Sequence, residues 1–224
     1  MPEPLGDTEQ EVRFRLPSAF SLPRSVLAEC DPLIETIDLI DIWYIPAAAA
    51  ESLTSHEEWL LSGSAAPVRI RFDSKASRIK LEAKVLEKSH MYNETREVSV
   101  GVSDVQHVDE LLRAIGFTRA AVLHKHRILA RHRDGVILCV DDYGSEGAIL
   151  EAERGEQCVL SEGLEALQAW VLRAFVGTRL GVAEPVALRV IRSNLLSSQR
   201  EPGGLTLDTL TEYDFMEAIS STMA

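Results

Sequence analysis

The sequence predicts an α+β protein whose sheet is largely antiparallel, and three observations lead to this fold class. Apolar and polar residues alternate in about eight segments, as they do in half-buried strands. Turn signals only a few residues long separate the later segments, which is typical of antiparallel hairpins. Helical periodicity occurs in fewer segments and dominates after Arg154, so the chain runs from strands to helices.

Each predicted strand shows a period of two, because successive side chains of a strand point to opposite faces of a sheet. In "EVRFRL", Val12, Phe14 and Leu16 alternate with charged residues. This segment is the first predicted strand, and the other seven are residues 37–45, 68–72, 78–86, 94–102, 121–132, 135–143 and 148–154.

Three longer segments have the period of a helix, at residues 47–61, 103–117 and 161–181. Ser103 and Ser161 are candidate N-caps, while Gly116 and Gly181 are candidate stop signals. The tail at residues 206–220 is weakly helical. Two apolar stripes are expected to pack against the sheet: Val105, Val108, Leu111, Leu112 and Ile115 in the second helix, and Leu164, Leu167, Trp170, Val171 and Phe175 in the third.

Length and spacing indicate a single domain over residues 1–224, with strands and helices in residues 1–154 and a helical C-terminal part in residues 155–224. The third helical stripe is a candidate contact in a homodimer. We therefore expect one folding unit, either monomeric or dimeric.

Charge and cysteine content exclude several classes of protein. The formal net charge is -12, which argues against general nucleic-acid binding because that depends on basic surfaces. The three cysteines form no CxxC pair, so we expect a reducing compartment and no zinc knuckle. The chain has no signal-peptide pattern and no apolar run long enough to span a membrane. The expected location is the cytoplasm, with no membrane partner.

Like charges recur at alternate positions of several predicted strands, for example Arg69 with Arg71 and Glu151 with Glu153. Such residues lie roughly 7 Å apart, so they repel each other unless opposite charges lie between them. An open sheet with one solvated face is the ordinary explanation for alternation. A closed or nearly closed eight-stranded antiparallel β-barrel explains these charges better, because it turns the apolar faces outward beneath the helices and the charged faces into a tunnel. Arginine forks suit phosphate oxygens, and carboxylates suit Mg²⁺ or Mn²⁺.

Six short motifs follow one another along the chain in a fixed order. They are Glu9-x-Glu11-x-Arg13, Asp41 to Tyr44 with Trp43, Arg69-x-Arg71, Lys84, Lys125-x-Arg127, and Asp141 followed by Gly147, Glu151 and Glu153. Together they resemble the CYTH family of triphosphate tunnel metalloenzymes, which includes class IV adenylyl cyclases, thiamine triphosphatases and inorganic triphosphatases. The sequence departs from the family pattern in four places: Arg13 replaces a lysine, one acidic position near Glu97 is missing or shifted, the segment between Tyr44 and Arg69 is long, and Arg192 stands where the family usually has a tyrosine.

The resemblance implies a division of roles among the charged residues. Glu9, Glu11, Asp141, Glu151 and Glu153 would hold Mg²⁺ or Mn²⁺. The basic residues would surround the substrate, with Arg13, Lys84, Lys125 and Arg127 acting on the reacting phosphate and Arg15, Arg69, Arg71 and Arg96 completing the binding ring.

The favoured function is a metal-dependent hydrolase of inorganic triphosphate or of a small organic triphosphate. Phosphoryl transfer depends mainly on positioning and charge neutralisation, which such a tunnel provides. The alternatives are a class IV adenylyl cyclase, a non-catalytic receptor for polyphosphate or nucleotide, and an unrelated antiparallel sheet protein. We favour hydrolysis over cyclisation because the sequence contains no identifiable adenine-selective motif.

Overall fold

The structure is a computed structural model that describes residues 8–17, 22–31, 34–50, 68–86 and 94–183. Within these ranges, only the backbone is described at residues 8–9, 84–86, 94–96 and 182.

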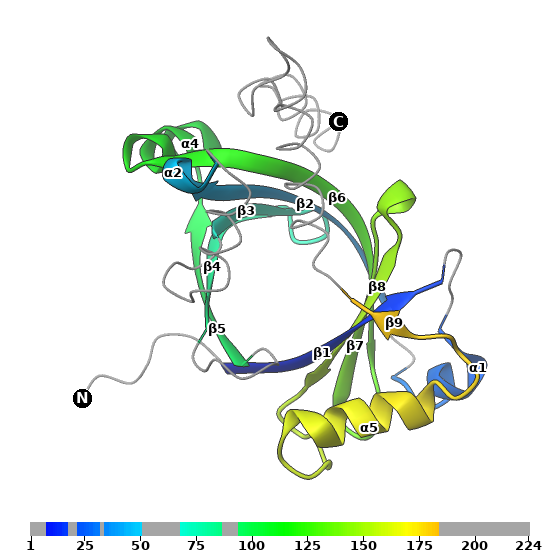
Figure 1. Ribbon diagram of the computed structural model, residues 1–224. Helices are drawn as coiled ribbons and strands as arrows, with labels where there is room; N and C mark the ends of the chain where they lie inside the picture. Colours follow the sequence, from blue (N-terminus) through cyan, green and yellow to red (C-terminus); the bar gives the residue numbers. More distant parts are fainter. Residues whose placement is uncertain (1–7, 18–21, 32–33, 51–67, 87–93, 184–224) are drawn as a thin grey trace, which may run out of the picture.

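One antiparallel sheet contains the described strands, and Figure 1 shows how it curls so that its two ends approach each other. The order is β5-β4-β3-β2-β6-β7-β8-β1-β9. The strands are β1 (Thr8–Leu16), β2 (Glu35–Pro46), β3 (Val68–Asp73), β4 (Arg78–Leu86), β5 (Glu94–Val102), β6 (Phe117–Arg131), β7 (Val136–Asp142), β8 (Ala148–Arg154) and β9 (Gly181–Val182).

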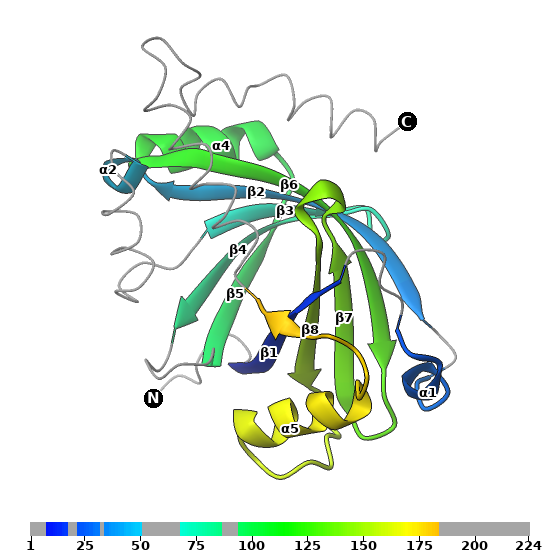
Figure 2. The same cartoon turned by 45° about the vertical axis from the view of Figure 1, so that its right-hand side comes forward.

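Strand β1 pairs along both of its edges. One edge pairs with β8 from Glu11 to Leu16. The other edge pairs with β5 over three residue pairs at the start of β1, and with β9 over two pairs near its end. The barrel-like curvature is visible from the side in Figure 2. The α+β class is confirmed, and β9 is a short strand that the sequence did not indicate.

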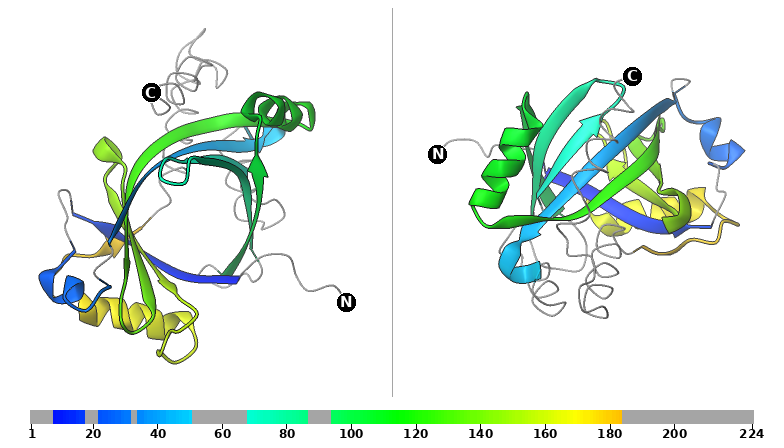
Figure 3. Two further views of the ribbon diagram at one scale, coloured as in Figure 1. Left: turned by 180° about the vertical axis from the view of Figure 1, so that it is seen from behind. Right: turned by 90° about the horizontal axis from the view of Figure 1, so that it is seen from above.

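Two helices cover the outward face of the curled sheet, on opposite sides of it (Figure 3). Helix α5 (Leu164–Ala174) buries Leu167, Trp170 and Val171, which recur at helical spacing. They pack in one apolar core with alternate residues of β1, β7 and β8 and with Val26 of α1 (Arg24–Leu27). This packing assigns the even-numbered residues of β1 to the outside, so the intervening charged residues point inward.

Helix α4 (Val105–Ala114) packs on a second core around Ile42, Ile70 and Leu112. A buried polar group fixes it in place. Asp109 accepts hydrogen bonds at Oδ1 from the Tyr44 hydroxyl and from Arg119 Nε, both at 2.7 Å. These bonds join α4 to β2 and β6.

The eight predicted strands are present, but the predicted helices are corrected at their ends. Asp104 rather than Ser103 caps α4, because its carboxylate accepts the amide hydrogen bond of His107. Gly163 rather than Ser161 precedes α5, which ends at Ala174, well before Gly181.

Part of one predicted apolar stripe is also corrected, because Leu111 and Ile115 are 58% and 61% exposed. Helix α2 (Ala47–Ala50) begins the first predicted helix, and the rest of that segment lies outside the described residues, as does the tail at 206–220.

The three cysteines are free thiols. In the described part of the chain, every helix is too short or too polar to cross a membrane. The short helix α1 was not predicted.

Candidate functional site

Each of β1 to β8 contributes at least one charged residue to the concave side of the sheet. Strand alternation is the local cause, because the apolar residues between them are taken up by the outer cores under α4 and α5. The described residues that meet there are Glu11, Arg13, Asp41, Arg69, Arg71, Glu82, Glu97, Lys125, Arg127, Asp141, Glu151 and Glu153.

Asp41 on β2 is a buried carboxylate that contacts three basic side chains. Arg71 donates two hydrogen bonds to it, Nε to Oδ1 at 2.6 Å and Nη2 to Oδ2 at 2.7 Å. Arg69 Nη1 and Lys125 Nζ lie 3.8 and 4.0 Å from Oδ2. Burial alone would raise the pKa of Asp41, but Arg71 and Arg69 outweigh it and hold this pKa well below its usual range. Asp41 therefore stays ionised, and it pairs with basic side chains of β3 and β6.

Arg69 also reaches the strands on the other side of β3. Its Nε donates to Glu82 Oε2 at 2.7 Å, and its Nη2 lies 3.5 Å from Glu97 Oε2. Glu82 also lies 3.6 Å from Arg71 Nη1. This contact shows that the side chain of Glu97, on β5, faces the site.

Asp141 on β7 is the second buried centre. Arg127 donates Nε to Oδ1 at 2.6 Å and Nη2 to Oδ2 at 2.7 Å, and Lys125 donates to Oδ2 at 2.5 Å. The Nη2 group of Arg127 also donates to Glu151 Oε2 at 2.7 Å. Burial, followed by repulsion from Arg127, lowers the pKa of Lys125 to about 8. Asp141 and Glu151 are thus linked through one guanidinium.

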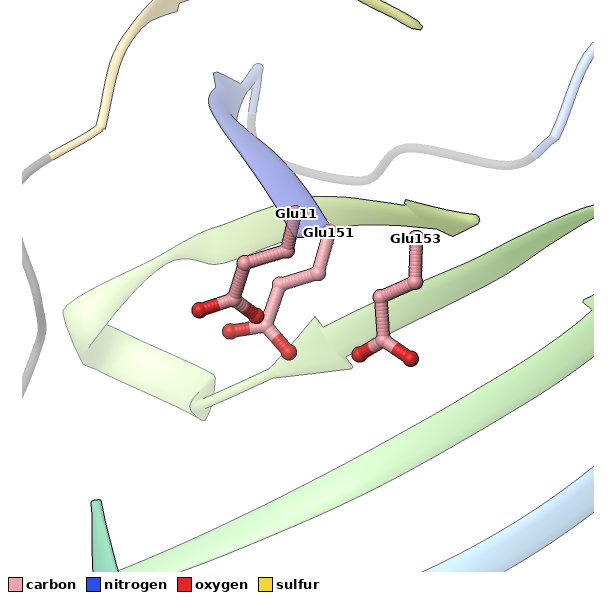
Figure 4. A group of neighbouring side chains, drawn as sticks. All are labelled: Glu11, Glu151 and Glu153. Carbon is pink, nitrogen blue, oxygen red and sulfur yellow. The ribbon is translucent and has the colours of Figure 1, made fainter. Parts of the chain in front are cut away.

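Glu11, Glu151 and Glu153 form a compact carboxylate group on β1 and β8, called here the acidic triad. The register places Glu11 opposite Glu153 and Arg13 opposite Glu151. One oxygen from each glutamate lies within 4.8 Å of the others, and Figure 4 shows the three side chains on one side of the two strands. Arg13 donates to Glu11 at 2.6 Å and to Glu151 at 2.9 Å.

The donor chemistry of the acidic triad suits a hard divalent cation. Mg²⁺ and Mn²⁺ prefer carboxylate oxygens, and three carboxylates this close together repel one another unless positive charge compensates them. Arg13 and Arg127 supply that charge in the structure. The residues present therefore fit a divalent cation by chemistry and by proximity.

The structure brings most of the predicted site residues together. They are Glu11, Arg13, Arg69, Arg71, Lys125, Arg127, Asp141, Glu151 and Glu153. Asp141 contacts Lys125 and Arg127, and it is connected to the acidic triad through Arg127. Arg15 is exposed near the end of β1, beside Ile149 and Gly181.

Three predicted site residues, Glu9, Lys84 and Arg96, have described backbones in β1, β4 and β5, but their side chains lie outside the description. The backbone of Lys84 pairs with Glu97, and that of Arg96 pairs with Val85. Their predicted roles stay predictions.

Four contributors were not among the predicted site residues: Asp41, Glu82, Glu97 and Tyr143. Asp41 and Glu82 could have been predicted by aligning β2 and β4 beside β3, because each lies opposite an arginine of β3 in the register. Tyr143 follows Asp141 by two residues, and its hydroxyl lies 3.4 Å from Asp141 Oδ2. Only the folded chain shows this contact.

The sequence matches no protein-family model, and no curated protein matches it. Solved structures with similar folds do exist. The putative adenylyl cyclase HpAC1 from Hippeastrum, described as having a dominant triphosphatase activity, is 17% identical with a TM-score of 0.57, over 89% of this chain and 99% of that one.

Two further structures from microorganisms show the same likeness. The PH1012 protein from Pyrococcus horikoshii OT3 is 18% identical with a TM-score of 0.56, over 80% of this chain and 98% of that one. A putative adenylate cyclase from Bacillus halodurans is 14% identical with a TM-score of 0.50, over 80% and 96%. At these identities the likeness concerns the fold alone.

Proposed function

We propose that this chain, which shares the fold of CYTH-type proteins, is a metal-dependent hydrolase of inorganic triphosphate or of a small organic triphosphate. One observation carries the proposal: a group of basic side chains on the concave side of the sheet, called here the cation ring, contacts the acidic triad through Arg13 and Arg127. The cation ring consists of Arg13, Arg69, Arg71, Lys125 and Arg127. Phosphate oxygens and divalent cations need these two kinds of partner side by side.

In this proposal the basic residues bind and orient the triphosphate. Arg69, Arg71 and Arg127 present planar forks that match pairs of phosphate oxygens, while Lys125 acts as a point charge. Each of them is already held by a carboxylate, so its position is fixed before the substrate enters. Such preorganised charge lowers the barrier because little rearrangement is needed when negative charge develops.

The acidic triad would hold Mg²⁺ or Mn²⁺, with Glu9 and Asp141 as the further predicted ligands. A bound cation would neutralise phosphate oxygens and acidify a water molecule for attack on the terminal phosphorus. Glu11 and Glu151 are paired with Arg13 and Arg127. We therefore infer that the triphosphate takes over these guanidinium groups and leaves the carboxylates to the cation, so that the two ligands bind cooperatively.

Adenylate cyclisation is the second candidate, because the similar Bacillus halodurans structure is described as a putative adenylate cyclase. Hydrolysis is preferred because HpAC1, also named a putative cyclase, is described as dominantly a triphosphatase. Both reactions use a triphosphate held by cations, and they differ in which oxygen attacks which phosphorus.

Product analysis tests the proposal. The purified protein is incubated with tripolyphosphate, thiamine triphosphate and ATP, each with Mg²⁺, with Mn²⁺ or with EDTA, and the products are separated by chromatography. We expect metal-dependent release of phosphate that is strongly reduced in Glu151→Gln. Cyclic AMP with pyrophosphate would instead assign the cyclase, and binding without any product would assign a receptor.

A further inference from the structure

Strand β5 is paired along only one edge over most of its length. It pairs with β4 continuously from Thr95 to Val102. On its other edge, β1 pairs with residues 94–96 alone. Among the ranges that the structure describes, no strand pairs with this second edge at residues 97–102. The stretch therefore presents a row of backbone N–H and C=O groups of the kind that pairs with another strand.

The side chains of this stretch are exposed on both faces of the sheet. Val98 and Val100, on the outward face, are 40% and 59% exposed. Ser99 and Gly101 alternate with them and are exposed as well. Edge strands in natural proteins are usually protected by charged residues, by proline or by a bulge, and residues 98–102 contain no charged residue and no proline. The sequence of this edge therefore permits pairing rather than preventing it.

Helix α4 places further exposed apolar side chains beside this edge. Val108 of α4 packs in one cluster with Leu81 of β4, and Leu81 lies opposite Val100 in the register. On the same helix, Leu111 and Ile115 are 58% and 61% exposed. Apolar surface therefore flanks the unpaired backbone groups of β5.

A second copy of this chain fits this edge. Two identical strands pair antiparallel about a two-fold axis perpendicular to the sheet, and two-fold symmetry is the commonest symmetry of homodimers. A pairing centred on Val100 places Val98 opposite the partner subunit's Val102 and keeps Glu97 of each copy beyond the paired residues. On the outward face it forms a row of β-branched side chains, which stabilise neighbouring strands through cross-strand contacts.

Charge favours this surface for contact between two copies. The formal net charge is -12, so two copies repel each other over much of their surface. Residues 98–102 carry no charge, so pairing them places no like charges opposite each other. The pairing also leaves the contact of β1 with residues 94–96 intact.

We propose that two copies of this chain form a two-fold dimer in which β5 of each copy pairs antiparallel with β5 of the other through residues 98–102. The two curled sheets then join into one continuous sheet. This inference is independent of the proposed function, because residues 98–102 belong neither to the acidic triad nor to the cation ring.

Sedimentation equilibrium of the purified full-length protein over a range of concentrations tests the dimer. Val100→Lys introduces two ammonium groups that face each other at the two-fold axis. Val176→Lys is the matched control, because Val176 is 81% exposed and follows α5, away from β5. Thermal melting establishes that both variants are folded.

We expect the wild type to form a dimer as its concentration rises. Val100→Lys should raise the dissociation constant of the dimer at least about tenfold, because opposed like charges destabilise an interface. Val176→Lys should change it less than about twofold, the ordinary effect of a surface substitution outside an interface. A wild type that stays monomeric at every concentration overturns the inference, as does a dimer that Val100→Lys and Val176→Lys affect equally.

Hydrogen exchange of the wild type at low and high concentration locates the contact without any substitution. We expect the amides of residues 98–102 that point to the open edge to exchange more slowly at high concentration. Slow exchange at every concentration would show that another part of the same chain covers this edge, and it would overturn the inference. Fast exchange there in a sample that is dimeric by sedimentation would place the dimer contact elsewhere and would overturn it too.

Discussion

At the scale of single residues, the site is a network in which each buried aspartate contacts several basic side chains. Asp41 contacts Arg71, Arg69 and Lys125, and Asp141 contacts Lys125 and Arg127. Removing one member leaves its partners buried with uncompensated charge, which costs more than the loss of a single surface ion pair. Substitutions therefore need a stability measurement beside each activity measurement.

Arg69→Ala should reduce kcat/KM for a triphosphate substrate. Loss of one charge-assisted contact typically costs roughly 2–4 kcal/mol of transition-state stabilisation, so we expect a decrease of about 30- to 1000-fold. Steady-state kinetics measures the effect. Arg133→Ala is the control, because Arg133 is exposed and pairs with Glu29 away from the site. Wild-type kinetics in a folded Arg69→Ala protein would remove Arg69 from the site.

Asp109→Asn should destabilise the protein at neutral pH. Burial would raise the pKa of Asp109, but the hydrogen bonds from Arg119 and Tyr44 outweigh it and lower this pKa below its ordinary value. The ionised form therefore stabilises the fold above the unfolded-state pKa, and this contribution is lost as the pH falls through the folded-state pKa. An unsatisfied buried group costs about 1–3 kcal/mol, which is the expected loss at pH 7.

Urea unfolding of wild type and Asp109→Asn at several pH values checks this sign. The difference in the free energy of unfolding should shrink at strongly acidic pH. A difference that stays constant down to acidic pH would contradict the assigned role of the carboxylate. Glu110→Gln is the neighbouring control, since Glu110 is on the exposed face of α4.

At the scale of elements, strands were predictable and helix ends were not. Alternation identifies a strand from its own residues, as in "EVRFRL", and the hairpin turns follow from short glycine-containing loops. Helix caps depend on which of several neighbouring polar residues reaches the free amides. Ser103 and Asp104 are both suitable caps, and only the folded backbone shows that Asp104 reaches the amide of His107.

Gly135 at the β6–β7 turn provides a test at this scale. Its φ is +76°, and an added Cβ would lie 2.5 Å from backbone atoms of Cys158. Gly135→Ala should therefore lower the free energy of unfolding by at least about 2 kcal/mol, from strain and steric clash together.

Gly144→Ala separates the effect of backbone strain from that of steric clash. Gly144 has a φ of +62°, and no described atom lies within 4 Å of the position of its Cβ. Strain alone should cost this variant about 1 kcal/mol. Thermal or urea unfolding of both variants gives the comparison, and equal losses would show that the contact with Cys158 has no effect.

At the scale of the whole molecule, the charge pattern predicted that basic and acidic residues meet on one side of a curled sheet. This could be anticipated because alternation assigns each charged residue to one face of its strand. The curvature of the sheet then turns that face inward. The pairing of individual charges could not be anticipated. Arg127 joins Asp141 to Glu151 only because β6, β7 and β8 lie in a particular register.

The central claim is that the acidic triad and the cation ring form one site for a divalent cation and a triphosphate. The most direct test is a Mn²⁺ titration followed by electron paramagnetic resonance, with and without tripolyphosphate, on the wild type, on Glu153→Gln and on the surface control Glu110→Gln. We predict that the wild type and the control bind Mn²⁺, that tripolyphosphate tightens this binding, and that Glu153→Gln weakens it at least tenfold. Equal Mn²⁺ affinity in all three proteins, or an affinity that tripolyphosphate leaves unchanged, would contradict the account.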